Sequence, residues 1–154
     1  MIYLLDKAIF YSKGYFYPYK IFSYVENEAR YSADYRLLAD SLAAMFEKYH
    51  VIDPDAVKIL LDKSKEKMHN DYEKLSLAFS YNRNGYYDEA KEIFYPTVKF
   101  ISDKIKAEKK DYQSVRSLLI SLDEEYDTDR DDKNFIWKLE LSNKLYGAFY
   151  NDKD

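Results

Sequence analysis

The residues whose types and spacing could support chemistry are concentrated in one acidic run, residues 123–132 (DEEYDTDRDD), which holds seven carboxylates and one arginine. Every second residue from Asp127 to Asp131 is aspartate, as in the first half of a calcium-binding loop. Such a loop needs glycine at its sixth position and glutamate at its twelfth, where this chain has Asp132 and Lys138. We therefore expect no calcium site but a solvated turn or an acidic docking patch. The candidate acidic patch consists of Asp123, Glu124, Glu125, Asp127, Asp129, Asp131 and Asp132.

Few other residues could serve catalysis or hold a metal ion. The two histidines, His50 and His69, have no cysteine partners because the chain contains none, and neither stands in an HExxH-type frame. Three glycines in 154 residues leave no glycine-rich loop that could bind a phosphate. We therefore expect no metal, no cofactor and no enzymatic activity.

Charge argues against nucleic acid as a partner. The formal net charge is −4, of which the acidic run carries −6, so the remainder of the chain carries +2. A chain with this balance is not expected to bind nucleic acid non-specifically. One lysine cluster is interleaved with Asp103 and Glu108, which is typical of a solvated helix end. Its members are Lys99, Lys104, Lys106, Lys109 and Lys110.

The chain has the length of one domain and no segment with the composition of a membrane span. Residues 1–16 are apolar but are interrupted by Asp6 and Lys7, and no basic segment precedes them as it would in a signal peptide. We therefore expect a soluble, cytoplasmic protein with no membrane partner. A single domain over residues 1–150, followed by a polar tail at 151–154, suits the length.

Apolar residues recur at helical spacing along most of the chain and predict an all-α fold. No segment shows the strict alternation of a half-buried strand. The four clearest stripes are Tyr35, Leu38, Leu42, Met45, Phe46 and Tyr49; Val57, Leu60, Leu61 and Met68; Val115, Leu118, Leu119, Leu122 and Tyr126; and Phe135, Leu139, Ser142, Tyr146 and Phe149. Each stripe defines the face that a helix is expected to bury.

Local signals divide these stripes into about eight helices, joined in pairs by short turns. The signals are Lys13-Gly14, Pro18, Asp53-Pro54, Asn70-Asp71, Asn84-Gly85, Asp111 and Asp131-Asp132. Pro96 does not fit this scheme, because it lies inside the apolar pattern of a helix that begins near Tyr87. The stripe continues in phase beyond it, which favours a kinked helix over one that stops and restarts.

Residues 71–104 carry a repeat-like pattern. Leucine and a small residue stand on the first helix, glycine and an aromatic residue in the turn, and alanine and an aromatic residue on the second helix. The matching residues are Leu77, Ala78, Tyr81, Gly85, Tyr87, Ala90 and Phe94. The pattern resembles a tetratricopeptide repeat, although Lys74, Thr97 and Ser102 depart from it. The small residues would let two helices approach closely while the aromatic ones fill the space around them.

The resemblance implies antiparallel hairpins stacked as a short right-handed solenoid, and the alternative is an irregular helical bundle. Weaker echoes of the repeat occur around Gly14, between Ala43 and Leu60, and from Leu145 to Tyr150. Tetratricopeptide proteins bind an extended peptide or a partner helix on the first helix of each pair. By that analogy the exposed candidates are Lys7, Tyr11, Arg36, Asp40, Glu47, Lys74, Asn82 and Arg83.

These observations favour an interaction module that binds a protein or peptide in a tetratricopeptide-like groove. One alternative is a peptide-sensing regulatory domain. Another is a small phage or mobile-element inhibitor whose acidic surface mimics nucleic acid or blocks a basic site. An exposed apolar flank from Leu145 to Tyr150 would in addition predict a homodimer formed through the C-terminal helix.

Overall fold

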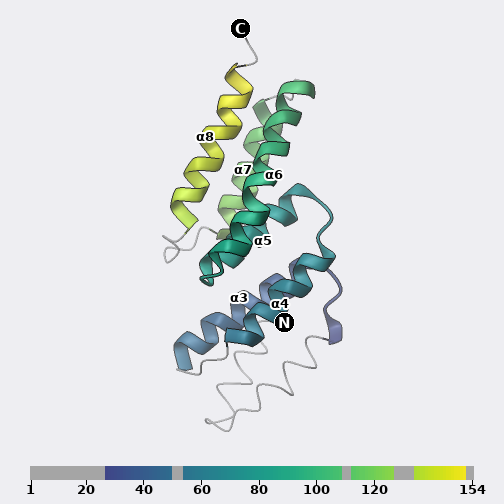
Figure 1. Cartoon of the computed structure of the whole chain (residues 1–154), viewed down its shortest axis with the longest axis vertical. Coiled ribbons are helices and arrows are strands. Elements are labelled where there is room, and N and C mark those ends of the chain that lie inside the picture. Colours follow the sequence, from purple (N-terminus) through teal and green to yellow (C-terminus); the bar gives the residue numbers. More distant parts are fainter. Residues whose placement is uncertain (1–26, 50–53, 109–111, 127–133, 152–154) are drawn as a thin grey trace. The chain divides into compact units, whose positions relative to one another are not determined.

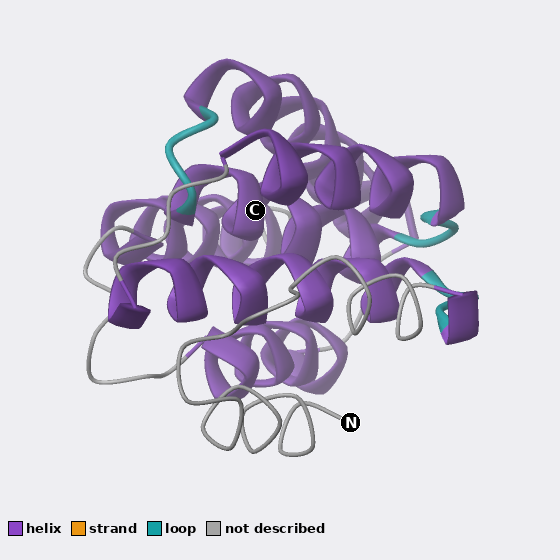
Figure 2. Ribbon diagram, turned by 90° about the horizontal axis from the view of Figure 1, so that it is seen from below, coloured by secondary structure: helices purple, strands orange, loops and turns teal. Residues whose placement is uncertain are grey.

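In the computed structural model the described residues are 27–49, 54–108, 112–126 and 134–151, and they form six helices and no strand (Figures 1 and 2). The all-α prediction is therefore confirmed. The turns expected at Gly14 and Pro18 lie outside the described residues, so the count of eight helices stays a prediction, as does the solenoid. The chain divides into two compact units, Met1–Met68 and His69–Asp154.

The described helices of the first unit are α3 (Ser32–Tyr49) and α4 (Pro54–Lys67), which pack against each other as a hairpin. Pro54 begins α4, as expected for a residue whose fixed φ suits the first helical position. The hydroxyl of Ser64 donates to the carbonyl oxygen of Ser32 at 2.8 Å, and both side chains are buried. This contact ties the first turn of α3 to the last turn of α4.

The second unit contains four helices. They are α5 (Asp71–Arg83), α6 (Tyr87–Glu108), α7 (Tyr112–Tyr126) and α8 (Phe135–Asn151). α5 and α6 form a hairpin, α8 lies beside α6, and α7 packs on α8 and on α5 (Figure 1). The last helix begins at Phe135, and Asp131-Asp132, which were expected to open it, lie outside the described residues.

The cap at the beginning of α5 is confirmed. Asn70 has extended backbone angles, and its side-chain oxygen accepts a hydrogen bond from the backbone N–H of Glu73 at 2.8 Å. The carboxylate of Glu73 in turn accepts from the backbone N–H of His69 at 2.6 Å. This reciprocal pair satisfies N–H groups that have no partner within the helix, and it therefore fixes where α5 starts.

The end of α5 is a glycine-based cap. Gly85 has a φ of +86°, and its N–H donates to the carbonyl oxygen of Asn82 at 3.1 Å. The N–H of Tyr86 donates to the carbonyl oxygen of Tyr81 at 2.9 Å, and the two rings meet edge to face. These two bonds and the ring contact make up the Schellman motif, which requires a left-handed residue at the position of Gly85.

Replacing Gly85 should therefore destabilise the second unit through the backbone alone. A Cβ at this position would meet no atom within 4 Å, so Gly85→Ala changes only the cost of the positive φ, about 1 kcal/mol. Gly147 lies inside α8 and is equally open around its Cα, so Gly147→Ala should stabilise by up to about 1 kcal/mol. Urea unfolding measures the change in the free energy of unfolding for each variant, which should fall for Gly85→Ala and rise for Gly147→Ala. A loss of stability in Gly147→Ala would contradict this prediction.

α6 runs without interruption through Pro96. The helix therefore continues past the proline, and the alternative in which it stops and restarts is wrong. The missing N–H and the ring of Pro96 disturb the bond to the carbonyl of Glu92, but both residues are exposed, so water can satisfy that carbonyl. The inner side of α6 stays apolar across this point, from Phe94 to Val98.

The core of the α5–α6 hairpin follows the repeat-like pattern in part. The matching positions that lie completely inside are Leu77, Ala78, Tyr81, Ala90 and Phe94. The expectation for Tyr87 is wrong, because its side chain is 55% exposed. The preceding residue, Tyr86, provides the ring that packs on Tyr81, because it occupies the capping position described above.

α8 buries a face other than the expected one. The stripe expected in the core includes Phe135 and Leu139, and both are exposed. The buried residues of α8 are instead Leu141, Leu145 and Ala148. This second face meets α6, where the Trp137 ring lies 4.5 Å from the ring of Phe94.

Candidate functional site

Several expected site residues lie outside the part of the chain for which side chains are described. Lys7 and Tyr11 precede the first described residue, and Glu47 belongs to α3 without a described side chain. In the acidic patch, Asp123, Glu124 and Glu125 belong to the last turn of α7, again without described side chains. The remaining members, Asp127, Asp129, Asp131 and Asp132, lie outside the described residues. The acidic patch and its proposed docking role therefore stay predictions.

Two of the expected exposed residues are buried. The side chain of Arg36 is 2% exposed and that of Asn82 is 4% exposed, so the expectation of solvent-facing side chains is wrong for both. The Asn82 amide nitrogen donates to the side-chain oxygen of Asn134 at 2.8 Å. The Asn134 amide nitrogen donates to the carbonyl oxygen of Phe79 at 3.1 Å. Asn82 therefore joins α5 to the start of α8 from inside the unit.

The other described candidates are partly exposed. Asp40, Lys74 and Arg83 are all half-buried, and Lys74 lies 3.8 Å from Asp71 in an ion pair within α5.

Helix α5 offers little surface between its ends, because every residue from Leu75 to Asn82 is buried. A helix that is covered on all sides needs no polar face, and residues 75–82 of α5 accordingly include no charged side chain.

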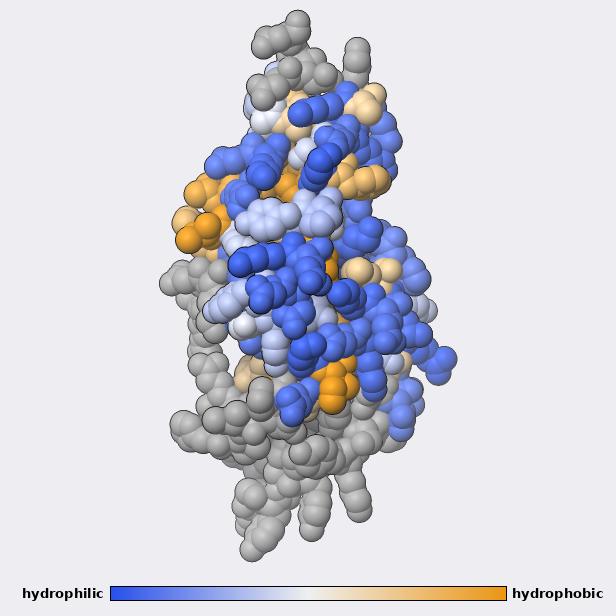
Figure 3. Space-filling view, viewed as in Figure 1, coloured by the Kyte–Doolittle hydropathy of each residue, from blue (hydrophilic) through white to orange (hydrophobic). Residues whose placement is uncertain are grey.

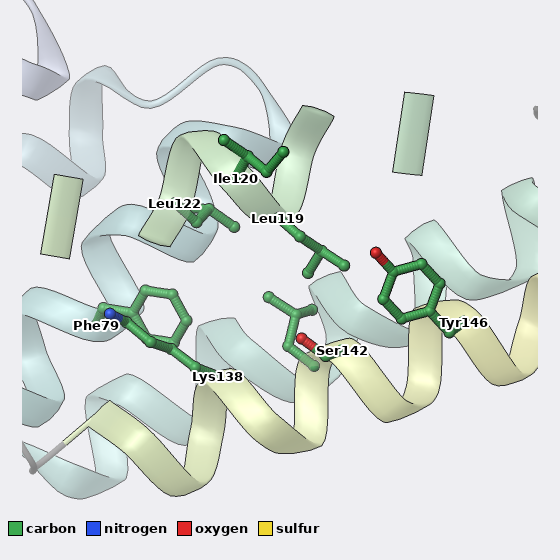
Figure 4. Close-up of a pocket in the computed structure, with 8 residues that line it drawn as sticks. Phe79, Leu119, Ile120, Leu122, Lys138, Ser142 and Tyr146 are labelled. Carbon is green, nitrogen blue, oxygen red and sulfur yellow. The ribbon is translucent and has the colours of Figure 1, made fainter. Parts of the chain in front are cut away.

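The second unit has an open groove between α7 and α8 with a volume of about 240 Å³. Figure 4 shows Leu119 and Leu122 of α7 facing Ser142 of α8, with Tyr146 at one end of the groove and Phe79 and Lys138 at the other. The groove is lined by Phe79, Leu119, Ile120, Leu122, Lys138, Leu141, Ser142 and Tyr146. It is mainly apolar, with one ammonium group, one phenol and one small hydroxyl among its side chains.

The apolar surface continues from the groove along α8. Ser142 and Tyr146 line the groove, and Leu139 and Phe135 precede them at helical spacing on the same face. Leu139 is 52% exposed, and Ile120 on the α7 side is exposed as well. Figure 3 shows hydrophobic residues at the left edge of the molecule, over the first half of α8. The expected stripe is therefore one face of α8, but Phe135 and Leu139 on it are exposed and the remaining residues, Ser142, Tyr146 and Phe149, are half-buried.

Sequence reasoning found these residues but gave them the wrong role. Spacing identified the stripe from Phe135 to Phe149 as one face of a helix, which it is. α8 has a second apolar face, the one that contains Leu141 and Leu145, and periodicity alone does not say which of two apolar faces meets the core.

No group of three or more His, Asp or Glu side chains that could hold a metal ion occurs among the described residues. None of the helices in the described part of the chain is long and apolar enough to cross a membrane.

Comparisons with protein-family models, with characterised proteins and with solved structures find no match to this chain, so its likeness to tetratricopeptide repeats rests on the residues of the α5–α6 hairpin.

Proposed function

We propose that this chain is an interaction module that binds a partner protein through the groove between α7 and α8. The observation that carries the proposal is the mainly apolar lining of that groove, in which Ile120 is exposed, together with the exposed side chains of Phe135 and Leu139 beside it on α8. Soluble proteins seldom expose contiguous apolar surface, and where they do it is commonly a binding surface.

The chemistry of the groove favours an amphipathic helix as the bound element. Apolar side chains at i, i+3 or i+4, and i+7 of a partner helix would replace water over Leu119, Leu139 and Ser142. The small side chain of Ser142 leaves room for a large residue of the partner at the middle of the groove. Lys138 is the one charged residue in the lining, and it favours a carboxylate at that edge of the partner helix.

The resemblance to tetratricopeptide repeats supports a binding role in general terms but points to another surface. By that analogy the partner would lie on α5, the first helix of its pair. Most of α5 is buried, and the side chain of Asn82 is occupied by Asn134. We therefore place the binding surface on α7 and α8, where apolar side chains are available.

A photo-crosslinking residue at Leu139 tests this proposal. The chain carrying it is exposed to lysate of the cells that express the protein, and the crosslinked partner peptide is identified by mass spectrometry. We expect a single dominant partner, crosslinked through a segment with amphipathic helical spacing. The matched control is a crosslinker at Ile59, which is 54% exposed in the first unit.

Binding of the purified partner is then measured with groove variants. Leu139→Glu and Ile120→Glu should each weaken binding by about tenfold or more, because each places a charge where an apolar contact forms. Ile59→Glu should have no such effect. The proposal would be refuted if the partner crosslinked equally at Leu139 and Ile59. It would also be refuted if neither groove variant changed the affinity for the partner.

A further inference from the structure

The opposite flank of α8 forms a second groove, with α6, and its chemistry is different. The volume of this groove is about 530 Å³. It is lined by Tyr95, Lys99, Ser102 and Lys106 of α6 and by Asn143, Lys144, Gly147 and Ala148 of α8. Three ammonium groups from two helices thus line one groove, and none of its lining residues is acidic.

Two lysines of this groove form ion pairs with acids of their own helices. Lys99 lies 2.7 Å from Asp103, and Lys144 lies 3.6 Å from Glu140. The hydrogen bond between Lys99 and Asp103, followed by the attraction of their charges, raises the pKa of Lys99 and lowers the pKa of Asp103. Solvent screens such pairs strongly, so a carboxylate from a partner can exchange with Asp103 or Glu140 at small cost.

The floor of the groove has room for a peptide. Gly147 and Ala148 present almost no side chain, and a Cβ at Gly147 would meet no atom within 4 Å. Ser102 and Asn143 supply hydroxyl and amide groups that can bond to polar side chains of a bound peptide. The Lys144 ammonium lies 5.8 Å from the centre of the Tyr95 ring, which keeps it over the groove.

We propose that the groove between α6 and α8 binds an acidic peptide segment of a protein partner, whose carboxylates pair with Lys99, Lys106 and Lys144. This site is separate from the apolar groove between α7 and α8 and does not depend on it. Lys99 and Lys106 are seven residues apart on one helix, which separates them by about 10 Å along its axis. Carboxylates seven residues apart on a partner helix would match that spacing.

Several features favour a peptide over nucleic acid. The net charge of the chain is −4, so a polyphosphate backbone, which has a negative charge on every nucleotide, would be repelled at long range more strongly than a short peptide with a few carboxylates. The cationic groups are lysines, which lack the planar fork with which arginine binds phosphates and bases. Tyr95 is the single aromatic residue in the lining, whereas single-stranded nucleic acids usually stack on several.

The test uses two fluorescein-labelled peptides of identical composition. One carries glutamates seven residues apart on a helical alanine and glutamine background, and the other carries them side by side at one end. Binding to the full chain is followed by fluorescence anisotropy and by emission of Trp137, the one tryptophan, whose ring lies 6.2 Å from that of Tyr95. We expect the spaced peptide to bind at least about fivefold more tightly than the clustered one.

Two double variants with the same change in net charge separate the groove from a general charge effect. Lys106→Glu/Lys144→Glu should weaken binding of the spaced peptide by about tenfold or more, and Lys65→Glu/Lys91→Glu, at exposed positions elsewhere, by less than about threefold. Leu139→Glu should leave this binding unchanged, so failure here is distinguishable from failure of the apolar groove.

Three outcomes would overturn the proposal. The first is an equal loss of affinity in both double variants, and the second is no binding of either peptide at millimolar concentration. The third is displacement of the peptide by a single-stranded oligonucleotide that binds more tightly and depends on the same lysines. A folded state unchanged by circular dichroism in each variant excludes unfolding as the cause of a loss.

Discussion

Phe94→Ala should lower the free energy of unfolding of the second unit by about 3–5 kcal/mol. The Phe94 side chain is completely buried in α6, and its ring centre lies 6.1 Å from that of Phe79 and 4.5 Å from that of Trp137. It therefore joins α5, α6 and α8 at one point. Removing the ring leaves a cavity that these helices fill only in part, because each is held by its other contacts.

Urea unfolding followed by circular dichroism and by Trp137 fluorescence measures this loss. The fluorescence reports the contact between α6 and α8 directly, because Trp137 is the one tryptophan of the chain. The matched control is Phe100→Ala on the same helix, where the ring is exposed and the expected loss is within about 0.5 kcal/mol. Similar losses for the two variants would mean that Phe94 is not the packing centre of this unit.

Asn134→Ala should lower the free energy of unfolding by about 2–4 kcal/mol. Asn134 is completely buried, accepts a hydrogen bond from Asn82 and donates one to the carbonyl oxygen of Phe79. Alanine removes both bonds and leaves two buried polar groups without these partners, which costs more than the bonds themselves contribute. Asn143→Ala, on the exposed side of α8, should change stability little.

A double-mutant cycle tests whether Asn82 and Asn134 act as one unit. Asn82→Ala should cost about 1–3 kcal/mol, and the double variant should cost less than the sum of the two single ones. Additive losses would show that the two side chains are independent and would contradict the arrangement described here. If the cycle shows coupling, a variant of Asn82 that no longer binds a partner protein does so because its fold is weakened. Such a loss would then not identify Asn82 as a binding residue.

Helix boundaries were predictable because they depend on neighbours in the sequence. Asn70, Pro54 and Gly85 each act within four residues along the chain, through a side-chain bond to a nearby N–H, a fixed φ or a positive φ. The continuation of α6 through Pro96 was predictable for a related reason, since the apolar stripe keeps its phase on both sides of the proline.

The candidate sites were less predictable because they depend on pairs of distant residues. Asn82 is a polar residue at a position that the repeat pattern predicts to be exposed. In the structure it is buried and bonded to Asn134, which lies 52 residues later in the chain. The basic groove likewise combines Lys99 and Lys106 with Lys144 from another helix. In the sequence, Lys99 and Lys106 belong to a cluster of lysines interleaved with acids, and nothing in that cluster indicates that Lys144 lies beside it.

The sequence by itself determined that this chain is helical and where several helices begin and end, because those features follow from periodicity and from local hydrogen bonds. Only the tertiary structure decided which face of α8 is buried. That helix has two apolar faces, and the one with Leu141 and Leu145 meets α6 while the one with Leu139 stays open to solvent. On the buried side the Trp137 ring of α8 packs against the Phe94 ring of α6, and such a fit between distant side chains leaves no period in the sequence.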